Sequence, residues 1–111
     1  MSELNSLQQR IRDGLLLDAY GSLLTEKQRM ACEMILLQDL SLSESANVLG
    51  VSRQGVHDLL TRSREHMESI EEALGLIEKE SRIEEVRNTV EEYRAKLPDD
   101  FYDKLKNLLD L

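Results

Sequence analysis

The sequence is poor in residues that break, stiffen or cross-link a chain. Among 111 residues it has one proline, one cysteine, five glycines and no tryptophan. A single cysteine, Cys32, excludes an internal disulfide, and an unpaired thiol is typical of a reducing compartment, so we expect a cytoplasmic location. With few breakers and abundant Leu, Glu, Arg and Ser, the composition predicts an all-α protein.

Several functional features are also missing. No apolar run approaches the roughly 20 residues that span a bilayer, and the first residues lack a signal-peptide layout, so we expect no membrane insertion. The sequence has no glycine-rich phosphate loop and no cysteine cluster, and His57 and His66 would project from different faces of one helix. We therefore predict no metal, no cofactor and no enzymatic activity. Cys32 stands among apolar residues, as an inert core thiol does.

What the sequence has in excess is acid. The net charge is -8, which counts against a simple nucleic-acid-binding protein. The charge is unevenly spread, because residues 1–66 carry seven Lys/Arg and nine Asp/Glu, whereas residues 67–111 carry seven and thirteen. The N-terminal part therefore remains a candidate for binding nucleic acid.

The stretch Asp39–Leu60 predicts a helix-turn-helix. Ser43 is placed as the N-cap of a first helix that starts at Glu44. Gly50 stands where that helix ends, since without a Cβ it can adopt the left-handed conformation of a turn. The first helix should direct three apolar residues to a core: Ala46, Val48 and Leu49.

A second helix, capped by Ser52, is predicted from Arg53 to the stop signal at Gly75. Its inner line repeats at helical spacing and contains Val56, Leu59, Leu60, Ser63, Met67 and Ile70. A small residue, a glycine and two apolar residues at these intervals are typical of a helix-turn-helix whose second helix enters the major groove.

Polar and basic residue types around this helix suit nucleic-acid contact. Arg53 and Gln54 are the types that reach guanine and adenine edges, and Ser52 with the free amides of the helix start suits a phosphate. The candidate interface contains Lys27, Arg29, Ser52, Arg53, Gln54, His57, Thr61, Arg62 and Arg64. The competing interpretation is an ordinary solvated face, which Asp58 and Glu65 favour.

Two more helices should precede this motif. One is predicted over Glu3–Tyr20, with an apolar stripe of Leu4, Leu7, Ile11 and Leu15 that Leu16, Leu17 and Tyr20 widen near its end. The second should begin at the capping box formed by Thr25 and Gln28 and run through Leu37. Both should support the helix-turn-helix in one domain, residues 1–75.

Residues 76–111 should form a C-terminal helical extension. Apolar residues there repeat in heptads, at Leu76, Ile83, Val86, Val90, Tyr93 and Leu97. Pro98 should break the helix, and Asp99 or Asp100 should cap a short last one. The heptad line could pair with a second chain or fold back on the stripe of the first helix. We predict a homodimer, because one chain offers too little surface to cover all its apolar stripes.

Three blocks of the sequence carry a family resemblance: Asp18–Arg29, Gln38–Glu44 and Leu49–Asp58. They resemble the YlxM-type family of bacterial helix-turn-helix proteins, and the motif itself looks like region 4 of sigma-70-type factors. The resemblance covers about residues 10 to 95 and implies an all-α helix-turn-helix bundle with a C-terminal extension. Two departures, Ser45 for an apolar residue and Gly55 for alanine, weaken the implied DNA contact more than the implied fold.

The resemblance also implies a cellular setting. Members of that family are linked to the signal recognition particle pathway and are described as regulators. The implied partners are DNA or the particle's RNA, together with the pathway's targeting GTPases. The alternative is a protein adaptor, in which the acidic helices grip a basic targeting GTPase and the helix-turn-helix serves as scaffold.

Overall fold

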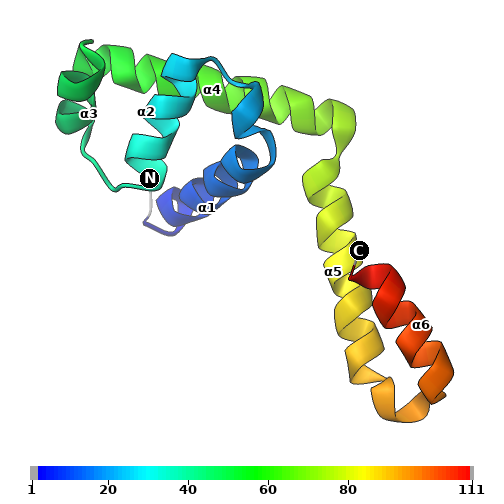
Figure 1. Ribbon diagram of the computed structural model, residues 1–111. Coiled ribbons are helices and arrows are strands. Elements are labelled where there is room, and N and C mark those ends of the chain that lie inside the picture. Colours follow the sequence, from blue (N-terminus) through cyan, green and yellow to red (C-terminus); the bar gives the residue numbers. More distant parts are fainter. Residues whose placement is uncertain (1–2, 111) are drawn as a thin grey trace. The chain divides into compact units, whose positions relative to one another are not determined.

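The computed structural model describes residues 3–110, with side chains from residue 6 onward, as helices joined by short turns (Figure 1). This part of the chain contains no strand, and the predicted all-α helix-turn-helix bundle is confirmed. The elements are α1 (Glu3–Tyr20), η1 (Gly21–Leu23), α2 (Glu26–Leu36), α3 (Leu42–Leu49), α4 (Arg53–Leu74), α5 (Leu76–Glu92), η2 (Arg94–Lys96) and α6 (Asp99–Leu109).

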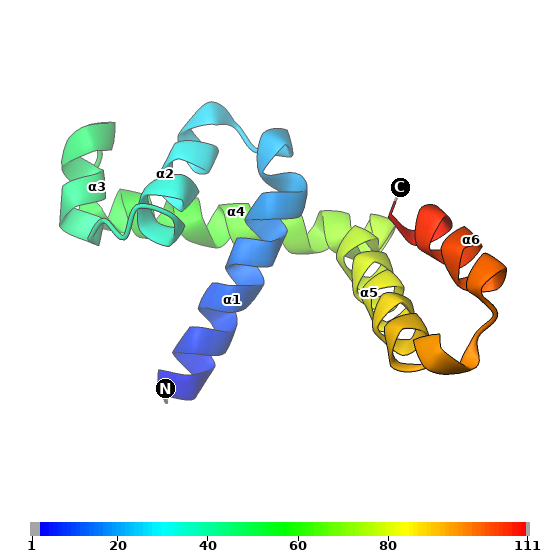
Figure 2. The same cartoon turned by 60° about the horizontal axis from the view of Figure 1, so that its bottom comes forward.

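The chain divides into two compact units, Met1–Gly75 and Leu76–Leu111. In the first unit, α1, α2 and α3 all pack on the long helix α4, as both ribbon views show (Figures 1 and 2). Their shared core contains Leu16, Leu17, Tyr20, Leu24, Ala31, Cys32, Met34, Ala46, Val56 and Met67. Burial of these side chains provides most of the stabilisation of the unit and fixes the direction of α4.

The predicted cap of α2 is confirmed, and that of α3 is wrong by two residues. Thr25 and Gln28 form a reciprocal capping box. Ser41, rather than Ser43, caps α3: its hydroxyl accepts the Glu44 N–H at 3.0 Å, and the Glu44 carboxylate accepts the Ser41 N–H at 3.0 Å. Only Ser41 has a glutamate three residues later, so it satisfies two end amides at once. The predicted inward position of Val48 is also wrong, since it is 61% exposed.

The turn between α3 and α4 is as predicted. Gly50 has φ +69°, and the N–H groups of Gly50 and Val51 both donate to the Ala46 carbonyl, at 2.9 and 3.1 Å. Gly75, with φ +64°, ends α4 in the same left-handed conformation. Both glycines therefore stand where an L side chain would be strained.

The apolar stripe predicted for α1 is buried only at its C-terminal end. Leu7, Ile11 and Leu15 are 55%, 57% and 49% exposed, so their predicted inward position is wrong, and the side chain of Leu4 lies outside the described residues. The buried face carries Leu16, Leu17 and Tyr20, which were expected to widen the stripe, together with Asp13. The face with Leu16, Leu17 and Tyr20 packs on α4 because it buries large side chains and because Asp13 and Tyr20 form hydrogen bonds to α4.

The second unit is a helical hairpin of α5 and α6. The predicted continuation of α5 to Leu97 is wrong: it ends at Glu92, and η2 leads to Pro98. Neither Asp99 nor Asp100 caps α6, because Pro98 is the N-cap residue, without a side-chain cap. Both aspartates lie in the first turn, where the helix dipole favours negative charge.

Within the described residues, no helix combines the length and hydropathy that crossing a membrane requires.

Candidate nucleic-acid interface

The exposed start of α4 is held in place by its cap. The Ser52 hydroxyl accepts the Gly55 N–H at 2.9 Å, as predicted for an N-cap. A Cβ at Gly55 would lie 3.2 Å from the Ser52 hydroxyl oxygen and 3.3 Å from the Val51 Cβ. Close packing of the turn against the helix therefore accounts for a glycine inside the first turn of α4.

Three basic side chains on α4 are available to a ligand. Arg53, His57 and Arg62 are exposed, and no hydrogen bond or ion pair within residues 6–110 engages them. Gln54 is also exposed, but its amide donates to the Asp58 carboxylate at 3.0 Å, one turn further on. A ligand that binds Gln54 through its amide must therefore replace this internal bond.

The basic groups of α4 do not form one stripe. At 100° per residue, the position opposite the buried line of Val56, Ser63 and Met67 is occupied by Gln54, Asp58, Thr61 and Glu65. Arg53 and His57 lie to one side of this centre, and Arg62 lies to the other. Asp58 and Glu65 thus stand between Arg53 and His57 on one side and Arg62 on the other.

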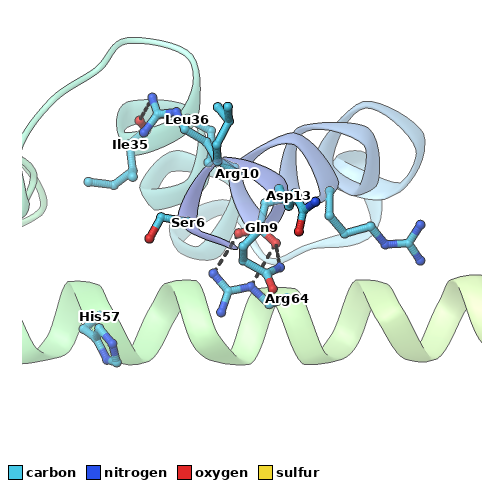
Figure 3. Close-up of a pocket in the computed structure, with 11 residues that line it drawn as sticks. Ser6, Gln9, Arg10, Asp13, Ile35, Leu36, His57 and Arg64 are labelled. Atoms are coloured by element: carbon cyan, nitrogen blue, oxygen red, sulfur yellow. Dashed lines mark hydrogen bonds and ion pairs between the residues drawn. The ribbon is translucent and has the colours of Figure 1, made fainter. Parts of the chain in front are cut away.

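Arg64 does not face outward as predicted but turns toward α1. It donates to both carboxylate oxygens of Asp13, from Nε at 2.9 Å and from Nη2 at 2.7 Å (Figure 3). Gln9 donates to the same carboxylate at 2.8 Å. The hydrogen bonds that Arg64 donates to Asp13 raise the pKa of Arg64, and the bidentate pair joins α1 to α4. Its role is thus to orient the helix that carries the interface.

The two predicted contact residues on α2, Lys27 and Arg29, lie in different surroundings. Lys27 is exposed in the first turn of α2. Arg29 lies 3.8 Å from Glu33 and lines a hollow of about 500 Å³ between α1 and α2, whose lining contains no residue of α4. Arg29 therefore does not join the α4 cations in the structure, and Lys27 remains a proposed backbone contact.

A larger groove of about 1070 Å³ lies where α1 leaves α4 (Figure 3). His57 and Arg64 of α4 line one side, and Ser6 to Asp13 contribute much of the other. Its arginines are engaged: Arg10 pairs with Asp39 and donates to the Ile35 carbonyl, and Arg12 is 2.7 Å from Glu68. These links between helices were not predicted, although a lone Asp13 amid an apolar pattern was a usable signal of a buried ion pair.

Acid–base and metal chemistry find little support in this unit. Cys32 is 2% exposed, and burial raises the pKa of its thiol, which disfavours the reactive thiolate. Among the described residues, no group of three or more His, Cys, Asp or Glu side chains is arranged to hold a metal ion.

Residues 7–108 match the family model described as "Putative helix-turn-helix protein, YlxM / p13 like". The chain belongs to this family. It is 38% identical over 107 residues to a UPF0122 protein of Clostridium kluyveri, covering 93% of this chain and 96% of that protein. A UPF0122 protein of Desulforamulus reducens is 40% identical over 99 residues, covering 86% and 85%.

A UPF0122 protein of Caldanaerobacter subterraneus is 52% identical over 65 residues, covering 59% of this chain and 56% of that protein. The family assignment agrees with the observed motif of α3, Gly50 and α4. None of these names specifies a ligand.

Proposed function

We propose that this protein is a regulatory DNA-binding protein that reads the major groove with the first three turns of α4. The observation that carries the proposal is the set of exposed side chains Arg53, His57 and Arg62 on the second helix of a helix-turn-helix, which no hydrogen bond or ion pair within residues 6–110 engages. The major groove of B-DNA admits an α-helix, whereas that of A-form RNA is too deep and narrow for side chains to read.

Each contact has a defined chemical role. Arg53 in the first turn donates its paired N–H groups to the O6 and N7 atoms of guanine. The Ser52 hydroxyl and the free amides that follow it bind a phosphate, and Arg62 and Lys27 bind the backbone on either side. Asp58 suits the N4 amino group of cytosine, and its release from Gln54 frees that amide for adenine.

The negative charge shapes this function. With a net charge of -8 and Asp58 and Glu65 on the reading face, the protein repels most phosphate surfaces. Non-specific binding is therefore weak. A DNA site that offers a cytosine to Asp58, or whose backbone is distorted away from the two carboxylates, binds more tightly than other sites. Specificity here comes from rejection as much as from attraction.

The first experiment selects DNA sequences from a random pool with the full chain and measures binding by fluorescence anisotropy. Arg53→Ala should weaken binding to the selected site by about 1–3 kcal/mol and relax preference at one base. Arg29→Ala, a matched loss of charge on the opposite side of α2, should bind as the parent does. If Arg53→Ala retains both affinity and preference, α4 does not read DNA as proposed.

The acidic composition favours a second candidate, an adaptor in the signal recognition particle pathway. In that case the acidic helices bind a basic targeting GTPase, or the exposed cations of α4 bind the particle's RNA. A pull-down from cell extract, with and without nuclease, separates the cases. Capture of DNA fragments supports the first candidate, whereas a nuclease-resistant GTPase or the particle's RNA supports the second.

A further inference from the structure

We propose that α5 and α6 form half of a four-helix bundle, completed by the same hairpin of a second copy of this chain. The inference goes beyond nucleic-acid binding, since it concerns only residues 76–110. It also differs from the heptad pairing predicted from the sequence, because it assigns half of the contact surface to α6.

The hairpin lacks a core of its own. Among its described side chains only Tyr102 is buried, whereas each compact unit needs an apolar interior to be stable. Its two helices are joined largely by polar links: the Tyr102 hydroxyl donates to Glu91, and Arg87 donates to the Leu109 carbonyl. Arg94 also lies over the Tyr102 ring, 4.4 Å from its centroid. These links hold the helices side by side but bury little apolar surface.

The apolar side chains gather on the other side of the seam between the helices. At 100° per residue, Ile83 and Val86 lie about 60° apart on α5 with the half-buried Val90 between them, and Tyr93 follows directly after the end of that helix. On α6, Phe101 and Leu108 lie within about 20° of each other, roughly a quarter turn from the line of Tyr102 and Leu109.

Because the two helices run in opposite directions, these two arcs open toward the same side of the hairpin, while Arg87 and Glu91 lie toward the opposite side. The resulting surface has five large apolar side chains, from 40% exposed at Ile83 to 62% at Leu108. Half-buried Val90 and Leu105 form its floor. On α5 the charged Lys79 falls on the same line one turn before Ile83, whereas no charged residue lies between Phe101 and Leu108 on α6. This surface, here called the open face, consists of Ile83, Val86, Val90, Tyr93, Phe101, Leu105 and Leu108.

Its size fits pairing with itself. The five large side chains leave on the order of 500 Å² of apolar surface exposed per chain, or about 1,000 Å² across a two-fold interface, which is the lower limit for a specific interface. Two such hairpins give the antiparallel geometry of a four-helix bundle, with the open faces as its core. Closed two-fold pairing is the most common way for a chain to cover such a surface.

The charges at the rim also permit self-pairing. On α5, Lys79 lies on the line of the open face one turn before Ile83 and Arg82 borders that line, and on α6 Asp100 and Lys104 border the open face. The rim of each hairpin therefore carries both signs. A single-sign rim would have repelled a second copy and pointed instead to a partner of opposite charge.

The test is the mass of the full chain in the absence of nucleic acid, measured by sedimentation equilibrium at tens of micromolar. The parent should be a dimer. Val86→Arg places a charge at the centre of the open face and should raise the dissociation constant roughly a hundredfold. Asn88→Arg is the matched control, because it makes the same charge change two residues away on the outer side of α5, and it should remain dimeric.

Two outcomes overturn the proposal. A parent chain that is monomeric at these concentrations shows that the open face has another cover, whatever the variants do. A dimer that Leu15→Arg dissociates and Val86→Arg does not shows that the exposed stripe of α1 is the interface instead. Circular dichroism of each variant verifies helix content, and Phe101→Arg serves if Val86→Arg fails to fold. Failure of this proposal leaves the DNA-binding proposal standing, since the two use different residues and different measurements.

Discussion

Two buried serines show how much depends on a single partner. Ser45 and Ser63 are both fully buried between helices of the first unit. The Ser63 hydroxyl donates to the Leu59 carbonyl at 2.6 Å, whereas that of Ser45 has no partner among the described residues. A buried hydroxyl without a partner lowers stability, because it loses its hydrogen bonds to water and gains none.

Ser45→Ala should therefore raise the free energy of unfolding by about 1 kcal/mol. The measurement is urea denaturation of the full chain followed by circular dichroism. Ser63→Ala is the control: it removes a satisfied hydroxyl and should leave stability unchanged or lower. A Ser45→Ala variant less stable than the parent would show that this hydroxyl has a partner after all.

At the scale of single residues, a role could be predicted from the sequence where few residue types can fill it. Gly50 was predictable because a positive φ after a helix leaves little choice but glycine. The ion pair of Asp13 with Arg64 was not, since sequence periodicity records apolar spacing and does not record which charges meet between distant helices. Arg64 was consequently expected on the outward face.

At the level of whole elements, the sequence predicted the existence and order of the helices better than their ends and faces. α1 and α4 have the predicted bounds because both end at clear stop signals. The face of α1 was predicted only in part, because that helix has two apolar sides and the local pattern does not tell which one meets α4. Helix α5 was overextended because apolar spacing continues to Leu97 after the helical backbone has ended.

The cap of α3 gives that element a dependence on pH. Hydrogen bonds from the backbone and side chain of Ser41 hold the pKa of Glu44 below its ordinary value. A group whose pKa is lower in the folded state stabilises the fold at a pH above its unfolded pKa. That contribution is lost as the pH falls through the range in which carboxylates titrate, about pH 4.

Glu44→Gln should retain stability near pH 7, since glutamine also completes a capping box, and should lose part of the fall in melting temperature between neutral and acidic pH. Melting curves from pH 7 down to about pH 3.5 measure this difference across the carboxylate range. Glu65→Gln, on the exposed side of α4, should melt with the parent's pH profile. Identical profiles for Glu44→Gln and the parent would mean that the cap does not depend on the carboxylate charge.

For the whole molecule, the sequence predicted an N-terminal helix-turn-helix and an acidic extension of two helices separated at Pro98, but not that these two helices form a hairpin. Heptad spacing carried the first of them to Leu97, whereas in the structure α5 ends at Glu92 and packs against α6. Pro98 explains the division, since the chain must turn before it and a second helix can start directly after it. The candidate dimer surface therefore moves from one helix to the open face of the hairpin.

The two proposed activities should respond to salt in opposite directions. Each chain carries a net charge of -8, so two copies repel, and screening of that repulsion should strengthen dimerisation as salt rises. DNA binding releases counterions, and with about three phosphate-neutralising cations the affinity should fall roughly fortyfold between 50 and 200 mM salt. Sedimentation and anisotropy of the same preparation at both salt concentrations test the two predictions.

A dimer that weakens with salt would show that ion pairs at the rim of the open face outweigh the repulsion between the chains. DNA affinity that does not change with salt would show that Arg53, Arg62 and Lys27 do not neutralise phosphates.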